Sequence, residues 1–196
     1  MKTTVLFGGT FNPFHIGHYE MLSALCGRPE IERVLVIPDR IPPHKHCDYL
    51  APDADRVKMC GLAAEDFEKA SVSKIELERA GKSYTIDTVS ELMQAYPDVG
   101  FALACGGDML ATLDTWHRGK ELIRMLPFYA FHRSDDKDFN GSVERLKKMG
   151  ARITVIDKKI TAVSSTELRR IIKSGEKPEA IPEKIWDYIK GRGLYV

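Results

Sequence analysis

The stretch from Thr3 to Leu25 reads TTVLFGGTFNPFHIGHYEMLSAL and decides the fold of this chain. Its apolar, β-branched start predicts a buried strand over Thr3 to Phe7, and its end predicts a helix over Ile16 to Leu25. Gly8 and Gly9 stand between the two, so a glycine turn follows the carboxyl end of the first strand. Open α/β sheets bind their ligands at this place. We therefore expect an anion site in the turn, where main-chain N–H groups can approach a phosphate.

Outward from this stretch, short apolar runs alternate with helical patterns, which predicts a doubly wound, Rossmann-like parallel sheet with helices on both faces. The 196 residues are expected to form a single domain, with a substrate loop at about 38–52 and a C-terminal helical segment at about 164–196. Further strands are expected at Val34 to Ile37, Val72 to Ile75, Phe101 to Ala104, Phe128 to Phe131 and Arg152 to Val155. Further helices are expected at Asp53 to Glu68, Thr85 to Ala95, Ser142 to Lys148, Ser165 to Lys173 and Pro182 to Lys190.

The composition limits the partners of the chain. Lys and Arg number 29 against 28 for Asp and Glu, so the net charge of +1 gives no bulk attraction to nucleic acid or to an anionic membrane. The four cysteines form no CxxC pair, which is typical of reduced thiols in the cytoplasm and indicates neither disulfides nor a zinc site. No apolar run has the length of a membrane span. We expect a cytoplasmic protein without a membrane partner, and the composition leaves a homo-oligomer open.

Two histidines follow the glycine turn. His15 and His18 are three residues apart, so a helix that has begun by His15 projects both rings from one face, with Gly17 keeping that space open. Two imidazoles can donate hydrogen bonds to a phosphate, most strongly when they are protonated. A metal pair is the alternative, but HExxH and a recognisable third ligand are absent. GxGxxG and GxxxxGK(S/T) are absent too, which counts against an ordinary dinucleotide domain and a P-loop enzyme.

A second polar group precedes a late amphipathic helix. Residues 163–169 read VSSTELR, in which Ser164 followed by Glu167 is the pattern of a capping box at a helix start. Such a start exposes hydroxyls and N–H groups that attract an anion. The forked, permanently charged guanidinium of Arg169 suits a triphosphate whose charge grows on the leaving pyrophosphate. A capped helix with solvated arginines is the alternative for this segment taken alone.

Together these segments resemble a known superfamily. GGTFNPFHIGH at 8–18 is similar to the (H/T)xGH signature of the nucleotidylyltransferases, and VSSTELR is similar to their ISSTxxR signature. Nearly the whole chain resembles the bacterial nicotinate-nucleotide adenylyltransferases in particular. The segments that carry this likeness are PPHK at 42–45, SYTIDT at 83–88, GGD at 106–108, TWHR at 115–118 and GLY at 193–195.

The resemblance implies a reaction and its participants. It implies adenylyl transfer from ATP to nicotinate mononucleotide, giving deamido-NAD and pyrophosphate in the biosynthesis of NAD, with Mg²⁺ carried mainly by the ATP phosphates and no metal site in the protein. The expected catalytic residues are His18, His15 and Arg169. The expected ATP-binding residues are Gly8, Gly9, Thr10, Phe11, His15, His18, Gly106, Asp108, Ser164, Ser165, Thr166 and Arg169. The expected mononucleotide-binding residues are His44, Lys45, Tyr84, Thr85, Trp116 and His117.

The residues of the mononucleotide end have the chemistry that this substrate needs. Lys45 and His44 offer a charge and a donor for its phosphate. Trp116 supplies a broad face on which a pyridine ring can stack. The resemblance further implies that main-chain N–H groups at Thr85 and near His117 bind the pyridine carboxylate, which accepts hydrogen bonds at both oxygens where a carboxamide accepts at one.

Two positions depart from the family pattern. Asn12 stands where Asp is more frequent, which removes a charge near the phosphates, and Asp39-Arg40 stand where small amides are usual. Tyr84, by contrast, follows the pattern, and the resemblance implies that Asp108 lies close to the nucleotide ribose.

The sequence leaves three other functions open. Nicotinamide mononucleotide is the nearest alternative acceptor. A phosphopantetheine adenylyltransferase shares both end motifs, but it is expected to be shorter and to lack SYTIDT and TWHR. An ATP-sensing module would bind ATP without turnover, and two histidines with a leaving-group arginine are more than a sensor needs.

Overall fold

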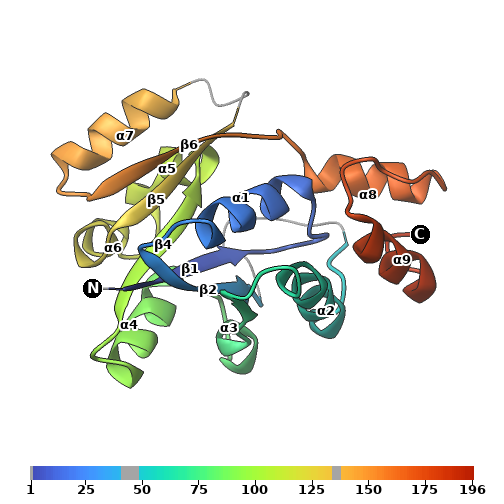
Figure 1. Cartoon of the computed structure of the whole chain (residues 1–196), viewed down its shortest axis with the longest axis horizontal. Helices are drawn as coiled ribbons and strands as arrows, with labels where there is room; N and C mark the ends of the chain where they lie inside the picture. The colour runs from blue at the N-terminus through green and yellow to red at the C-terminus, as the bar shows by residue number, and fades with distance from the viewer. Residues whose placement is uncertain (1, 41–48, 134–137) are drawn as a thin grey trace.

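The computed structural model describes residues 2–40, 49–133 and 138–196, and a parallel β-sheet lies at its centre (Figure 1). Within these ranges the six strands lie side by side in the order β3-β2-β1-β4-β5-β6, and each neighbouring pair is parallel. The order reverses between β1 and β4, which is the switch point where such sheets bind ligands. The predicted doubly wound, Rossmann-like sheet is confirmed. The strands are β1 (Thr3–Gly9), β2 (Ile31–Pro38), β3 (Ala70–Val72), β4 (Gly100–Gly106), β5 (Phe128–Arg133) and β6 (Ile153–Ile160).

Two buried clusters, one on each face of the sheet, hold the helices in place. Successive β1 residues point to opposite faces, so Val5 and Phe7 join one cluster and Leu6 joins the other. The first cluster packs against α1 (Ile16–Cys26), α2 (Asp53–Ala64), α8 (Ser165–Lys173) and α9 (Glu183–Arg192). The second packs against α3 (Ile75–Glu78), α4 (Thr85–Ala95), α5 (Gly107–Thr112), the short 3-10 helix η1 (Leu113–Thr115), α6 (Gly119–Met125) and α7 (Phe139–Lys148).

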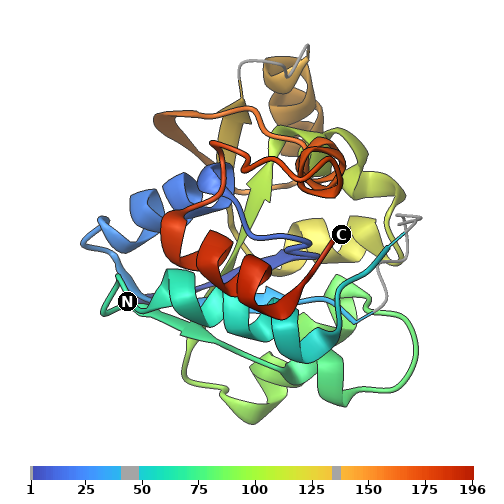
Figure 2. The same cartoon turned by 90° about the vertical axis from the view of Figure 1, so that its right-hand side faces the viewer.

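Helices α8 and α9 lie at one end of the molecule, beyond the carboxyl ends of the central strands (Figure 1, Figure 2). Hydrogen bonds fasten this part of the chain to α1. The N–H of Ile16 donates to the carbonyl of Ala180 at 2.8 Å. Thr161, just before α8, donates from its N–H and its hydroxyl to the Glu20 carboxylate at 2.7 and 2.8 Å. The late helices are thereby held beside the turn that follows β1.

The structure corrects one predicted strand. The strand predicted at Val72 to Ile75 instead occupies Ala70–Val72, and Ile75 opens the one-turn helix α3. Among the strands of the described residues, β3 lies at the edge of the sheet and pairs with β2 alone. The N–H of Ser73 donates to the carbonyl of Val36, and the pairing ends there. The alternation of apolar residues therefore does not mark its end.

Other element boundaries and several short helices also differ from the prediction. Helix α2 ends at Ala64 rather than Glu68, β6 continues through polar residues to Ile160, and α7 begins at Phe139 rather than Ser142. Helices α3, α5 and α6 were not predicted, because one or two turns are too short for the apolar period to show. None of the helices in the described ranges is long and apolar enough to cross a membrane.

We predict that Gly17→Ala lowers the free energy of unfolding by about 1–2 kcal/mol. A Cβ on Gly17 would lie 2.8 Å from the carbonyl oxygen of Thr161, so α1 and the segment before α8 would have to move apart; this overpacking exceeds the gain of about 1 kcal/mol in helix propensity. Gly61→Ala in α2 is the matched control, since its Cβ would meet nothing within 4 Å and should stabilise by about 0.5–1 kcal/mol. Urea unfolding measures both, and equal effects would contradict the close approach.

Candidate active site

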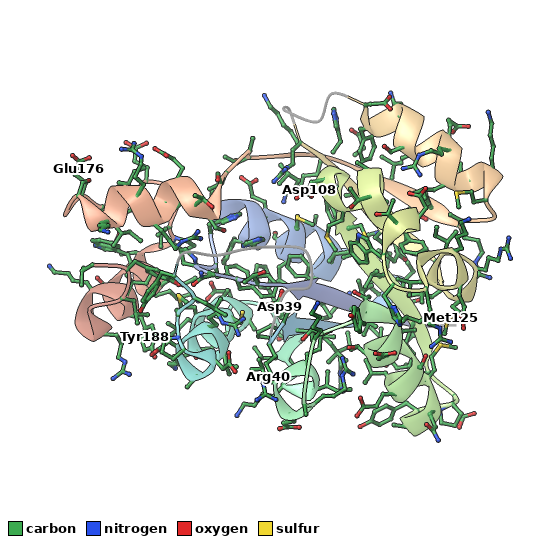
Figure 3. The ribbon with its side chains drawn as sticks, turned by 180° about the vertical axis from the view of Figure 1, so that it is seen from behind. Asp39, Arg40, Asp108, Met125, Glu176 and Tyr188 are labelled. Atoms are coloured by element: carbon green, nitrogen blue, oxygen red, sulfur yellow. The ribbon has the colours of Figure 1, made fainter. Side chains whose placement is uncertain are left out.

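A cavity of about 210 Å³ lies at the carboxyl ends of β1, β2 and β4, where the strand order reverses. Asp39, which follows β2, and Asp108, in α5, both line it and lie toward the centre of the molecule in Figure 3. The cavity brings together eight of the residues predicted for binding: Gly8, Gly9, Thr10, Tyr84, Thr85, Asp108, Trp116 and His117.

The turn after β1 offers its main chain to a ligand. A Cβ on Gly8 would meet nothing within 4 Å, so this residue borders open space, and a Cβ on Gly9 would lie only 3.0 Å from the Phe11 ring. That ring is buried, and Phe11 has a φ of 48°, a left-handed conformation that costs a non-glycine residue about 1–2 kcal/mol. Since the Phe11 side chain is committed to the core, this residue can serve a phosphate only through its main chain.

His15 and His18 lie together as a stacked pair. Their ring centroids are 3.6 Å apart, and helix α1 begins one residue after His15, which is its N-cap. The Nδ1 of each ring accepts from the backbone N–H of the other residue at 3.4 Å. An accepting nitrogen carries no proton, so this arrangement leaves the Nε2 of each ring as its hydrogen-bond donor.

Aromatic side chains fix the direction of the His18 ring. Its centroid lies 5.0 Å from that of Phe11 and 5.2 Å from that of Phe14, and the Phe7 ring is 6.3 Å away. The three phenylalanines belong to the cluster on the α1 side of the sheet. The core thus positions a histidine that is itself only half-buried.

The late helix reaches the same turn. The guanidinium of Arg169 donates from Nη1 to the carbonyl of Asn12 at 2.9 Å and from Nη2 to the hydroxyl of Thr166 at 3.2 Å. Ser164 caps the helix by accepting from the N–H of Glu167, as predicted. The predicted capping box is only half formed, since the Glu167 carboxylate pairs with Arg170 at 2.6 Å. The two motifs that the sequence separates widely therefore meet in space.

Asn12 has a different position from the one expected. Only 2% exposed, it turns its amide away from solvent, donating to the carbonyl of Tyr49 at 2.8 Å. Its Oδ1 accepts from the N–H of Ala51 at 3.1 Å and from the hydroxyl of Tyr195 at 2.9 Å. An ionised aspartate could not donate to Tyr49, so the amide is the group that suits all three partners. Asn12 holds the turn in place from inside the protein.

Sequence analysis missed Arg56, whose side chain is fully buried behind the turn. Its guanidinium donates to the carbonyl of Thr10 at 2.9 Å, pairs with Asp39 at 3.5 Å and also pairs with Asp53. The sequence does contain an indication of its burial, because Arg56 lies three positions before Met59 and so shares the buried side of α2. A charge on an apolar helix face indicates a buried partner.

Asp39 and Arg40, the two residues that differ from the family pattern, also connect the turn to its surroundings. Asp39 accepts from the hydroxyl of Thr10 at 2.9 Å, and its N–H donates to the carbonyl of Gly9 at 3.0 Å. The N–H of Arg40 donates to the hydroxyl of Ser83 at 3.0 Å. These contacts join the glycine turn after β1 to Ser83, which lies in the segment that leads into α4.

Aromatic rings and a helix start form the opposite end of the cavity. The ring centroids of Tyr84 and His117 are 4.3 Å apart, and Trp116, half-buried, donates from its indole nitrogen to the Thr112 hydroxyl at 3.1 Å. Helix α4 begins at Thr85, and within the described part of the chain no side chain caps it. The first N–H groups of a helix have no partner inside the helix. This end can therefore stack on a planar ring and donate to an anion.

Glu76 was also missed, although it lines the cavity. It is 8% exposed and accepts from the Thr88 hydroxyl at 2.8 Å. Burial raises the pKa of the Glu76 carboxyl, and the nearby charge of Asp39 adds to this, while hydrogen bonds from Thr88 and Ser83 and the charge of Arg79 oppose it. Glu76 was missed because the predicted strand ended at Ile75, so Glu76 was expected in a connecting segment and not in a helix beside the cavity.

Not all predicted residues border the cavity. The predicted residues that are described but absent from its lining are Phe11, His15, His18, Gly106, Ser164, Ser165, Thr166 and Arg169. Of these, Phe11 belongs to the turn after β1, and Arg169 reaches that turn through the Asn12 carbonyl. Gly106 approaches Asp108 so closely that a Cβ would lie 2.8 Å from its carboxylate, which also pairs with Arg133 at 3.8 Å. His44 and Lys45 lie outside the described residues.

Comparison with known proteins finds similar sequences and a similar fold. A family model described as cytidylyltransferase-like matches residues 6–171. A probable nicotinate-nucleotide adenylyltransferase of Listeria welshimeri is 36% identical over 97% of this chain and 95% of its own. A protein of Exiguobacterium sibiricum with the same description is 35% identical over 97% of both chains. The fold is similar to that of the nicotinic acid mononucleotide adenylyltransferase of Plasmodium falciparum complexed with APC, with a TM-score of 0.82 at 20% identity over 100% of this chain and 98% of the other.

We predict that Glu76→Gln changes how stability depends on pH. The raised pKa means that the native state holds this proton more tightly than the unfolded chain does, so the stability it contributes at low pH is lost as the pH rises above 4.5, the ordinary value. The amide cannot ionise and escapes this loss. Urea unfolding at pH 4 and pH 7.5 should therefore show the variant gaining stability relative to the wild type at the higher pH.

Glu68→Gln, at an exposed position, controls for the loss of one negative charge. A Glu76→Gln variant whose stability relative to the wild type is the same at both pH values would show that its surroundings do not raise the pKa of this carboxyl.

Proposed function

The chain belongs to the cytidylyltransferase-like family, and we propose that it transfers the adenylyl group of ATP to nicotinate mononucleotide, giving nicotinate adenine dinucleotide and pyrophosphate. The observation that carries this proposal is the hydrogen bond from Arg169 to the carbonyl of Asn12. It brings a guanidinium from the late helix to the turn that also presents His15 and His18. One triphosphate can then contact all three side chains.

The reaction needs alignment and charge stabilisation more than covalent chemistry. An oxygen of the mononucleotide phosphate attacks the α-phosphorus of ATP, a new P–O bond forms, and the bond to the β-phosphate bridging oxygen breaks in line with it. Negative charge grows on the departing pyrophosphate. Arg169 stabilises that charge, and the Nε2 hydrogens of the two histidines donate to non-bridging oxygens.

Mg²⁺ is the cofactor we propose, entering on the triphosphate. Within residues 2–40, 49–133 and 138–196, no three carboxylates, imidazoles or thiols lie close enough together to hold a metal ion. Bound to the triphosphate, Mg²⁺ would reduce the repulsion among its phosphate groups.

The cavity is suited to the pyridine end of the acceptor. Trp116 lines it with a stacking surface, and α4 begins there at Thr85 with uncapped N–H groups. A carboxylate accepts at both oxygens and is attracted to the positive end of a helix, whereas a carboxamide turns an NH₂ toward the same donors. This chemistry supports nicotinate over nicotinamide. The free thiols Cys26, Cys60 and Cys105 support a cytoplasmic location.

The first test identifies the product. The purified protein is incubated with ATP and Mg²⁺ and, in separate reactions, with nicotinate mononucleotide, nicotinamide mononucleotide or phosphopantetheine, and the products are separated by chromatography. We expect rapid formation of a dinucleotide and pyrophosphate with nicotinate mononucleotide only. Saturable ATP binding without pyrophosphate in any reaction would indicate a sensor, and a faster reaction with another acceptor would assign the enzyme to that acceptor.

A second prediction concerns the histidine pair. His18→Ala should lower turnover at least about a hundredfold, the usual effect of losing a donor to the transition state. His18→Gln keeps a side-chain N–H donor and should recover part of the loss. Thermal unfolding of both variants controls for folding, and near-normal turnover by a folded His18→Ala variant would refute the role of His18.

A further inference from the structure

The side chain of Asn12 has three partners from two separate parts of the chain. Tyr49 and Ala51 lie in the later part of the predicted substrate loop, and Tyr195 follows helix α9. Because Asn12 is 2% exposed, water does not readily replace a partner that is lost. The position of Asn12 therefore depends on all three contacts, and the Tyr195 hydroxyl is the one supplied from the far end of the fold.

The main chain of Asn12 connects its buried side chain to Arg169 and to the glycine turn. Its carbonyl accepts from Arg169 at 2.9 Å. The residue before it, Phe11, has the left-handed φ of 48° that shapes the glycine turn. A shift of the Asn12 side chain would move both the support of the guanidinium and the N–H groups of the turn.

Tyr195 is itself firmly held. Its side chain is buried, and its ring meets the Tyr49 ring edge-on, with centroids 5.5 Å apart. Burial raises the pKa of its hydroxyl, so the group remains a donor. Helix α9, which precedes it, is fixed to α2 because Asp55 accepts from Tyr188 at 2.6 Å and from Arg192 at 3.1 Å; Figure 3 shows Tyr188 between the two helices.

We propose that Tyr195 is a positioning residue for adenylyl transfer, acting through the Asn12 carbonyl on Arg169. The inference rests on the proposed function. Tyr195 touches neither substrate directly in this scheme. Its hydroxyl fixes the carbonyl on which the leaving-group arginine rests, so its removal should affect turnover more than substrate binding at the ring end of the cavity.

Two tyrosines of the same region allow a matched experiment. Tyr195→Phe removes the hydroxyl that binds Asn12, and Tyr188→Phe removes a hydroxyl that binds Asp55, away from the turn. We measure kcat, the KM for each substrate and the Tm of both variants. Tyr195→Phe should lower kcat about tenfold, because small displacements of groups around the reacting atoms are costly, and should leave the KM for nicotinate mononucleotide within about twofold. Tyr188→Phe should lower the Tm by a similar amount and keep the wild-type kcat.

A double-mutant cycle tests the route through the arginine. In an Arg169→Lys background the guanidinium that donates to the Asn12 carbonyl is gone, so Tyr195→Phe should lower kcat by less than about threefold. An equal loss in both backgrounds, or a Tyr195→Phe variant with the kcat of Tyr188→Phe, would overturn the inference while leaving the proposed function intact. A wild-type protein that forms no dinucleotide would instead overturn the proposed function.

Discussion

The hydrogen bond between the Arg169 guanidinium and the carbonyl of Asn12 is the contact on which the site depends, and it joins residues 157 positions apart. A guanidinium is always charged, so before a phosphate binds it needs another hydrogen-bond acceptor that holds it in place. The main chain of the turn supplies that acceptor. Buried groups behind the turn, Arg56 and the Asn12 amide, prevent it from moving.

The sequence was sufficient to predict those features that arise from local pattern. The apolar run and paired glycines at Thr3–Gly9 predicted both the central strand and the turn. The spacing of His15 and His18 predicted that their rings lie together, although His15 is the N-cap of α1 and not part of the helix. Ser164 was recognised as a cap, because capping depends on residues three positions apart. These interactions lie within a few residues of one another, so residue type and spacing determine them.

The features that were missed depend on contacts between distant segments. The buried Arg56 has partners at Thr10 and Asp39, and the Asn12 amide has partners at Tyr49 and Tyr195. No local period indicates which far residue will supply an acceptor. Ile75, the first residue of the one-turn helix α3, was predicted as strand for a related reason, since edge pairing with β2, and not residue preference, determines where β3 ends.

The two ends of the site rest on different buried clusters. Phe11, Phe14 and Leu168 support the phosphate end from one face of the sheet, whereas Ile86, Val89 and Leu110 support the ring end from the other. Substitutions that reshape one cluster leave the packing of the other largely unchanged, since the sheet separates them. Such a division would let an ancestral lineage exchange one acceptor molecule for another over evolutionary time while keeping its phosphate chemistry.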